Sequence, residues 1–245
     1  MIRRHYLPFY GILLFVIVTG CRESPQFVNH SPPALSVDAA AFADVGCSGE
    51  GYYRECHDDS PLAALGCDVI EAPSDLLGGL DPSYPIVRCV AYPGWERGEG
   101  RPVVDSEDES FFTVGGEMVG LVRYVIFRDG QFELIEAEDE FRGIFAPITS
   151  DEEALGYVLA VRKLSAYYDL AAESGYEYFV EDVEDTHVEK IADGFVVHLF
   201  DYEKFGCGPH RTYAVDVRVS TDGYVEEVKR EAIYKDPSQD NLCVD

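Results

Sequence analysis

The strongest constraint on the fold is a set of three Asp-Gly dipeptides, each lying between two runs of strand-like residues. They are Asp129-Gly130, Asp193-Gly194 and Asp222-Gly223. Asp-Gly is a favoured pair for a tight turn between antiparallel strands. In residues 213–219 the odd-numbered positions are Tyr or Val, so one face of that strand is apolar. The sequence therefore predicts at least six antiparallel strands joined as hairpins.

One long helix is predicted between the first and second hairpins. Ser150 and Glu153 form a capping box, in which the Ser150 hydroxyl bonds the Glu153 N–H and the Glu153 carboxylate returns the bond. Leu155, Val158 and Leu159 follow helical spacing, and the helix is expected to run to about residue 172. The predicted fold class is α+β: an antiparallel sheet of hairpins with one long helix packed on a face, preceded by a small disulfide-rich loop lobe.

Residues 150–234 resemble PepSY-type and cystatin-like modules. The resemblance rests on the order helix, connector, strand, turn, strand, on Glu153-Ala154 near the helix start and on a late Asp-Gly-x-Val at 222–225. Such folds include inhibitors, assembly aids and binding modules, so the resemblance implies a fold and no particular activity. Residues 205–210 and the cysteine-bearing C-terminal end are similar to bacterial lipoproteins of unknown function.

The N-terminus has the pattern of a secretory signal. Arg3 and Arg4 precede an apolar run at residues 9–18, which is about half the length that a membrane-spanning helix needs. The following residues, Val18-Thr19-Gly20-Cys21, resemble the lipobox of bacterial lipoproteins. That resemblance implies lipidation of Cys21 and removal of residues 1–20, and Arg22 after it implies the outer membrane, on either its periplasmic or its surface side. The alternative is an ordinary secretory signal with an incidental cysteine.

The chain is predicted to have four parts. A signal peptide at 1–20 is followed by a lipid anchor and tether at 21–44, where Pro25, Pro32 and Pro33 interrupt any apolar period. A Cys-rich lobe is expected at 45–104 and the α+β domain at 111–245. The acidic run at 105–110 between them is expected to be a solvated linker.

The other six cysteines are expected to form three disulfides, because an even number in an exported chain indicates a disulfide framework. Sequence proximity and the need to tie the C-terminal tail favour three of the fifteen possible pairings. The favoured pairs are Cys47–Cys56, Cys67–Cys89 and Cys207–Cys243. The alternative is a zinc site of Cys56, His57, Cys207 and His210, although the spacing between these pairs fits no strong zinc motif.

Charge excludes one class of partner. With 19 Lys and Arg against 46 Asp and Glu, the net charge is −27, so nucleic acid is not an expected partner. Acidic clusters at 105–109, 136–140 and 181–185 are candidates for weak surface binding of divalent ions, but the spacing of a calcium loop is missing. We interpret the acidity as solubility and adaptation to salt.

Three histidines are the candidates for chemistry. His198 lies in a run that is apolar on both faces, so a hydrogen-bonded core residue is expected. His187 follows Glu184 and Asp185 and is either a base oriented by a carboxylate or a histidine at a strand end on an acidic surface. His210, after a Gly-Pro turn, is expected to be exposed in a loop. Motifs for a nucleophilic serine, a zinc protease or a phosphate loop are missing.

The sequence thus indicates a lipid-anchored envelope protein whose expected function is non-enzymatic: a binding, inhibitory or assembly module. Its expected partners are the bilayer, through acylated Cys21, and an unidentified protein or small ligand. No catalytic residue, metal ligand or cofactor is assigned. The alternative is an envelope hydrolase or metal-dependent enzyme that uses His187 or His210.

Overall fold

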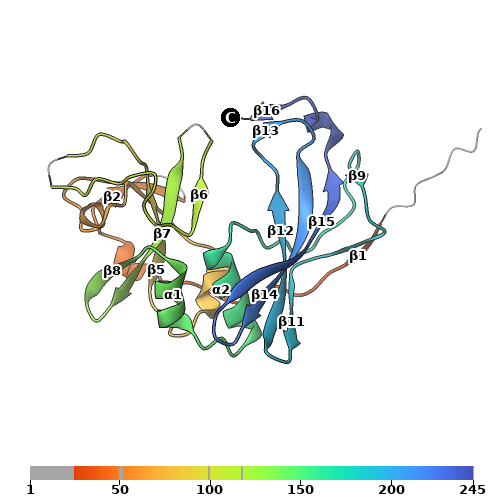
Figure 1. The fold of residues 1–245 in the computed structure, drawn as a ribbon, viewed down its shortest axis with the longest axis horizontal. Helices are drawn as coiled ribbons and strands as arrows, with labels where there is room; N and C mark the ends of the chain where they lie inside the picture. The colour runs from red at the N-terminus through yellow and green to blue at the C-terminus, as the bar shows by residue number, and fades with distance from the viewer. Residues whose placement is uncertain (1–24, 50–51, 99, 117, 245) are drawn as a thin grey trace, which may run out of the picture.

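The computed structural model describes residues 25–49, 52–98, 100–116 and 118–244. Most of its strands belong to two antiparallel sheets, which lie on either side of two helices (Figure 1). The predictions for residues 1–24, which include the signal peptide and lipidated Cys21, lie outside the described residues.

The first sheet is built by residues 47–135 in the strand order β2-β3-β4-β5-β7-β6, with β8 also paired to β7. The strands are β2 (Cys47–Ser48), β3 (Tyr53–Cys56), β4 (Val69–Glu71), β5 (Ile86–Ala91), β6 (Phe112–Val114), β7 (Gly120–Arg128) and β8 (Gln131–Ile135). Six residue pairs join β5 to β7. The predicted hairpin around Asp129-Gly130 therefore shares one sheet with the cysteine-bearing segment, which is built of strands rather than of loops alone.

The second sheet follows the order β11-β12-β14-β15-β9. Its strands are β9 (Glu177–Tyr178), β11 (His187–Ile191), β12 (Gly194–Tyr202), β14 (Arg211–Ser220) and β15 (Val225–Lys235). Val215, Val217 and Val219 of β14 are all buried, which confirms the apolar face expected for this strand.

The three predicted hairpins are all present, as β7–β8, β11–β12 and β14–β15. Asp129 and Gly130 both have positive φ, 54° and 81°, which is the conformation a two-residue hairpin turn requires. Gly194 is the first residue of β12 rather than part of the turn. A Cβ at this position would lie 2.1 Å from the carbonyl oxygen of Val219, so the close approach of β14 excludes any side chain there.

The single long helix was a wrong prediction: the described residues form two α-helices, α1 (Glu138–Phe145) and α2 (Asp151–Val161). Ser150 caps α2 by accepting from the Glu153 N–H, as expected, but the Glu153 carboxylate accepts from the Thr149 N–H instead of returning the bond to Ser150. The chain leaves the helix at Arg162, which has extended dihedrals of −127° and 144°.

Tertiary pairing explains why α2 ends so early. The backbone of Ser165 exchanges two hydrogen bonds with Phe200 of β12, at 2.8 and 2.9 Å. The Arg162 guanidinium is bound to Glu138 of α1 and to the Val225 carbonyl. A segment that bonds a strand edge cannot also continue a helix, and tertiary contacts override helix propensity.

Helix α2 lies at the centre of the core. Every residue from Ala154 to Val161 is buried, because one apolar cluster extends from the first sheet through both helices to the second sheet. In Figure 1 the two helices lie between the sheets, which diverge from this base. The fold therefore has three layers: sheet, helices, sheet.

The structure contains three disulfides, and they are the pairs favoured from the sequence: Cys47–Cys56, Cys67–Cys89 and Cys207–Cys243. The third joins β13 (Gly206–Cys207) to β16 (Cys243–Val244) and so ties the C-terminal end to the second sheet's loop. Because Cys56 and Cys207 are both oxidised, the four-residue zinc site considered from the sequence does not assemble.

The segment before Cys47 is packed against the second half of the chain. Strand β1 (Gln26–Val28) pairs in parallel with β10 (Asp182–Glu184), and Phe27 packs on the cluster that contains Val183 and Phe200. This part of the predicted tether is therefore ordered on the domain, and it positions the residue that follows, His30.

Candidate metal centre

Three histidine rings form a stack at the edge of the second sheet. His187, the first residue of β11, is paired in register with His198 of β12, and their ring centroids are 4.9 Å apart. The parallel pairing of β1 with β10 carries the chain to His30, whose ring stacks on the other face of His187 at 4.5 Å. Two independent strand pairings thus assemble a column of imidazoles.

Each ring has its Nδ1 next to an oxygen that can only accept. His30 Nδ1 lies 2.8 Å from the Asp185 carboxylate, and His187 Nδ1 lies 2.8 Å from the Asp185 backbone carbonyl. His198 Nδ1 lies 2.6 Å from the Asp216 carboxylate. The proton of each neutral ring therefore sits on Nδ1, which leaves a lone pair on Nε2. This is the tautomer of a metal-binding histidine supported by an oxygen acceptor.

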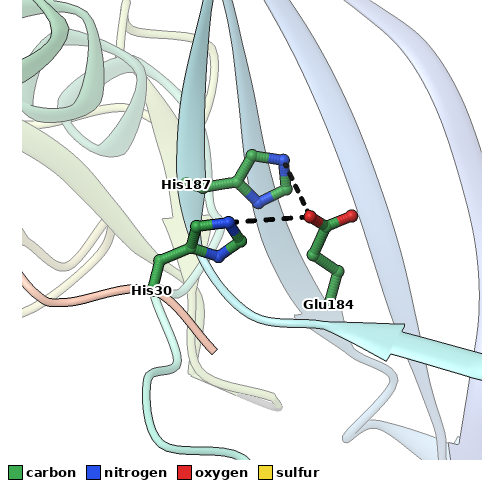
Figure 2. A group of neighbouring side chains, drawn as sticks. All are labelled: His30, Glu184 and His187. Carbon is green, nitrogen blue, oxygen red and sulfur yellow. Dashed lines mark ion pairs between the residues drawn. The ribbon is translucent and has the colours of Figure 1, made fainter. Parts of the chain in front are cut away.

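Two of these Nε2 atoms share a carboxylate neighbour. Glu184 Oε1 lies 3.6 Å from His30 Nε2 and 3.9 Å from His187 Nε2, and all three atoms lie within 4.8 Å of one another (Figure 2). Ligands of a tetrahedral zinc ion are about 3.4 Å apart. The separations are therefore slightly wider than a bound ion requires. Because the two rings stack at 27°, sharing an ion requires their planes to tilt toward each other.

Asp185 holds the N-terminal ligand in place from inside the protein. Its side chain is fully buried, and Oδ1 accepts both the ring Nδ1–H and the backbone N–H of His30, each at 2.8 Å. Its Oδ2 accepts the backbone N–H of Asp169 at 3.2 Å. Asp169 adopts a left-handed conformation with φ of 56°, which is unfavourable for a residue with a side chain. Such local strain is typical of positions that support a functional site.

The third ring of the stack, that of His198, is only slightly exposed. The Nε2 atom of His198 is buried and has no hydrogen-bond partner among the described residues, which is unfavourable for a polar atom. The hydrogen bond from His198 is the main cause that lowers the pKa of the Asp216 carboxyl below its ordinary value. The prediction that His198 is a hydrogen-bonded core residue is therefore only partly confirmed, since one ring nitrogen is bonded and the other is not.

This pair makes stability depend on pH in a defined direction. A carboxyl with a lowered folded pKa contributes stability above its unfolded pKa of about 3.9 and loses it as pH falls through the folded value. We expect His198→Phe to raise the pKa of Asp216. The variant's free energy of unfolding should therefore lie below that of the wild type at about pH 5, and this difference should shrink by about pH 3. Urea unfolding at both pH values measures this. An equal deficit at both would contradict the assigned bond.

A cavity of about 200 Å³ opens beside His30 and His187. Tyr168 and Thr186 line it, together with the first turn of α2. Burial and the nearby Asp185 carboxylate raise the pKa of Tyr168 to about 12, so its hydroxyl stays neutral and can donate a hydrogen bond to whatever occupies the cavity. The candidate centre thus has room for a further small ligand.

Among the histidines singled out from the sequence, only His187 and His198 belong to this site. His210 was expected to be exposed, and this is wrong: it is 3% exposed, and its ring nitrogens lie 2.8 and 3.1 Å from the carbonyls of Glu203 and Leu242. The Cys207–Cys243 bridge folds the C-terminal end over this loop and buries the ring. His57 is an exposed neighbour of Ser48.

No family model matches this chain, and no curated protein or solved structure shows a significant match to it. Among the described residues, neither helix has the length and apolarity that a bilayer crossing needs.

Proposed function

We propose that this protein is a lipid-anchored envelope protein that binds a divalent transition-metal ion through His30, Glu184 and His187. The observation that carries the proposal is the convergence of two Nε2 lone pairs on one carboxylate, with both rings fixed in the metal-binding tautomer. Two imidazoles and a carboxylate suit Zn²⁺, whereas Ca²⁺ and Mg²⁺ prefer oxygen ligands.

The predicted location agrees with this role. The lipobox-like residues 18–21 favour a location in the envelope, and the disulfides suit an oxidising compartment. In such a compartment the six bridged cysteines are not free to bind metal, which leaves histidine and carboxylate as the available ligands. The net charge of −27 also raises the local concentration of cations around the site.

A metal-dependent hydrolase is the second candidate, and one observation favours it. Three protein ligands leave a coordination position open, as in catalytic zinc sites. The 200 Å³ cavity borders His30 and His187 and is also lined by Asp151 and Glu152, carboxylates that can accept a proton. The enzyme and the binding module share the same metal site, so metal binding is the first property to test.

Isothermal titration with Zn²⁺ tests the proposal on the full-length protein, purified in detergent and stripped with a chelator. We expect one equivalent to bind, and His187→Ala to weaken binding by at least about 100-fold because it removes one of three ligands. His57→Ala is the matched control, since His57 is exposed and lies beside Ser48 of the first sheet. Equal affinity in the wild type and both variants would rule out this centre.

A further inference from the structure

A second site lies between the two sheets. A cleft of about 960 Å³ is bounded by β5 and β6 on one side and by β12, β14 and β15 on the other. The segment after α2, residues 162–165, forms its floor. In Figure 1 this is the region above the helices, where the sheets diverge. Its volume is that of a site for a small organic molecule.

The lining of this cleft is rich in cations for so acidic a chain. It contains five of them, Arg88, Arg162, Lys163, Lys204 and Arg230. The carboxylates in the lining are Asp201, Glu203 and Glu227. Arg88 and Arg162 are paired with Glu71 and Glu138, which lie outside the lining. The positive charge open to a ligand is therefore that of the lysines.

Two of these cations are available to a ligand. Arg230 is held by Glu227 and Asp201, at 2.9 and 2.6 Å. Lys163 and Lys204 have no carboxylate partner among the described residues, although the chain has 46 acidic residues. An anion can therefore bind these two ammonium groups without breaking an existing ion pair.

Both of these lysines lie close to the same aromatic ring. The Nζ atoms of Lys163 and Lys204 are each 5.6 Å from the centre of the Phe205 ring, which is 38% exposed. Cation–π contacts of this kind position both ammonium groups around one ring. The ring adds an exposed apolar surface directly beside the positive charge.

The rest of the lining is suited to an apolar body. Phe112, Val114, Leu164, Tyr167 and Tyr213 contribute to the walls. We infer that the cleft binds an organic anion with an apolar body, its acidic group attracted by Lys163 and Lys204 and its apolar part among these side chains. This site is separate from the metal centre and does not depend on it.

The probe is 1-anilinonaphthalene-8-sulfonate, an organic anion with an apolar body, and its fluorescence reports binding to the full-length protein. We expect saturable binding, which Lys163→Glu with Lys204→Glu weakens by at least about tenfold because attraction becomes repulsion. The matched control is Lys190→Glu with Lys229→Glu, which changes the net charge equally. Lys190 also lies over a phenylalanine ring, that of Phe195, but outside the cleft.

The uncharged analogue N-phenyl-1-naphthylamine separates charge from apolarity. It is expected to bind the wild type more weakly and to be insensitive to both double variants. Lys163→Gln with Lys204→Gln gives a milder second test should charge reversal impair folding. The inference is overturned if the wild type shows no saturable binding, or if the affinities of the two charge-reversed proteins differ by less than about threefold.

Discussion

Replacing Asp185 with alanine will destabilise the folded protein by about 3–5 kcal/mol, because three N–H donors lose their buried acceptor at once. These donors are the ring and backbone N–H groups of His30 and the backbone N–H of Asp169. The carboxylate is fully buried, so water does not replace it without a rearrangement of the surrounding segments. Urea unfolding of the metal-free protein measures the loss.

The same substitution will weaken Zn²⁺ binding by about 10–100-fold, which is the usual effect of removing the group that orients a ligating histidine. Asp182→Ala is the matched control, since Asp182 is an exposed aspartate of the neighbouring strand β10. Asp185→Asn retains an oxygen acceptor but removes the charge, and we expect an intermediate result. Unchanged stability in Asp185→Ala would show that the carboxylate does not hold His30.

The hairpins could be predicted because their determinants are local. At Asp129-Gly130 the turn residues and the alternation on both sides agree, and at Ser150 a single hydroxyl marks the start of α2. The end of α2 could not be predicted, since apolar residues continue past Val161 while the chain turns to pair with β12. That pairing connects Ser165 to Phe200, and local periodicity contains no information about it.

Sequence patterns could not predict the candidate metal centre, for the same reason. His30 and Asp185 are 155 residues apart, and a three-residue parallel pairing between β1 and β10 brings them together. Short parallel pairings leave no recognisable spacing. The one available signal was the density of acids beside His187, where Glu184 and Asp185 precede it. His30 lies in a segment without apolar periodicity, and no sequence signal marked it as a ligand.

Metal binding is also expected to hold the N-terminal segment on the domain, a consequence that rests on the proposed function. His30 is the ligand that comes from this segment, whereas Glu184 and His187 belong to the second half of the chain. Without metal, β1 is held by three residue pairs, the packing of Phe27 and the bonds to Asp185. Short pairings of this kind open more readily than the rest of a fold.

Hydrogen exchange measures that opening directly. With Zn²⁺ at 100 times its dissociation constant, a state that requires His30 is stabilised by about 2.7 kcal/mol, so the amides of residues 26–30 will exchange about 100-fold more slowly. Amides of β14 serve as the internal control. His30→Ala should abolish the effect of metal on residues 26–30. Identical exchange with and without bound Zn²⁺ would show that His30 is not a ligand.

Because His30 lies close in sequence to Cys21, opening of residues 26–30 would change the distance between the domain and the membrane. His30 lies nine positions after Cys21, the residue proposed to carry the lipid, and nine extended residues span at most about 32 Å. A bound metal ion would therefore fix the domain within that distance of the bilayer. Without the ion, residues 26–30 are expected to open more often and to lengthen the tether when they do, so metal removal is expected to increase cleavage of this segment by added protease in membrane-bound protein.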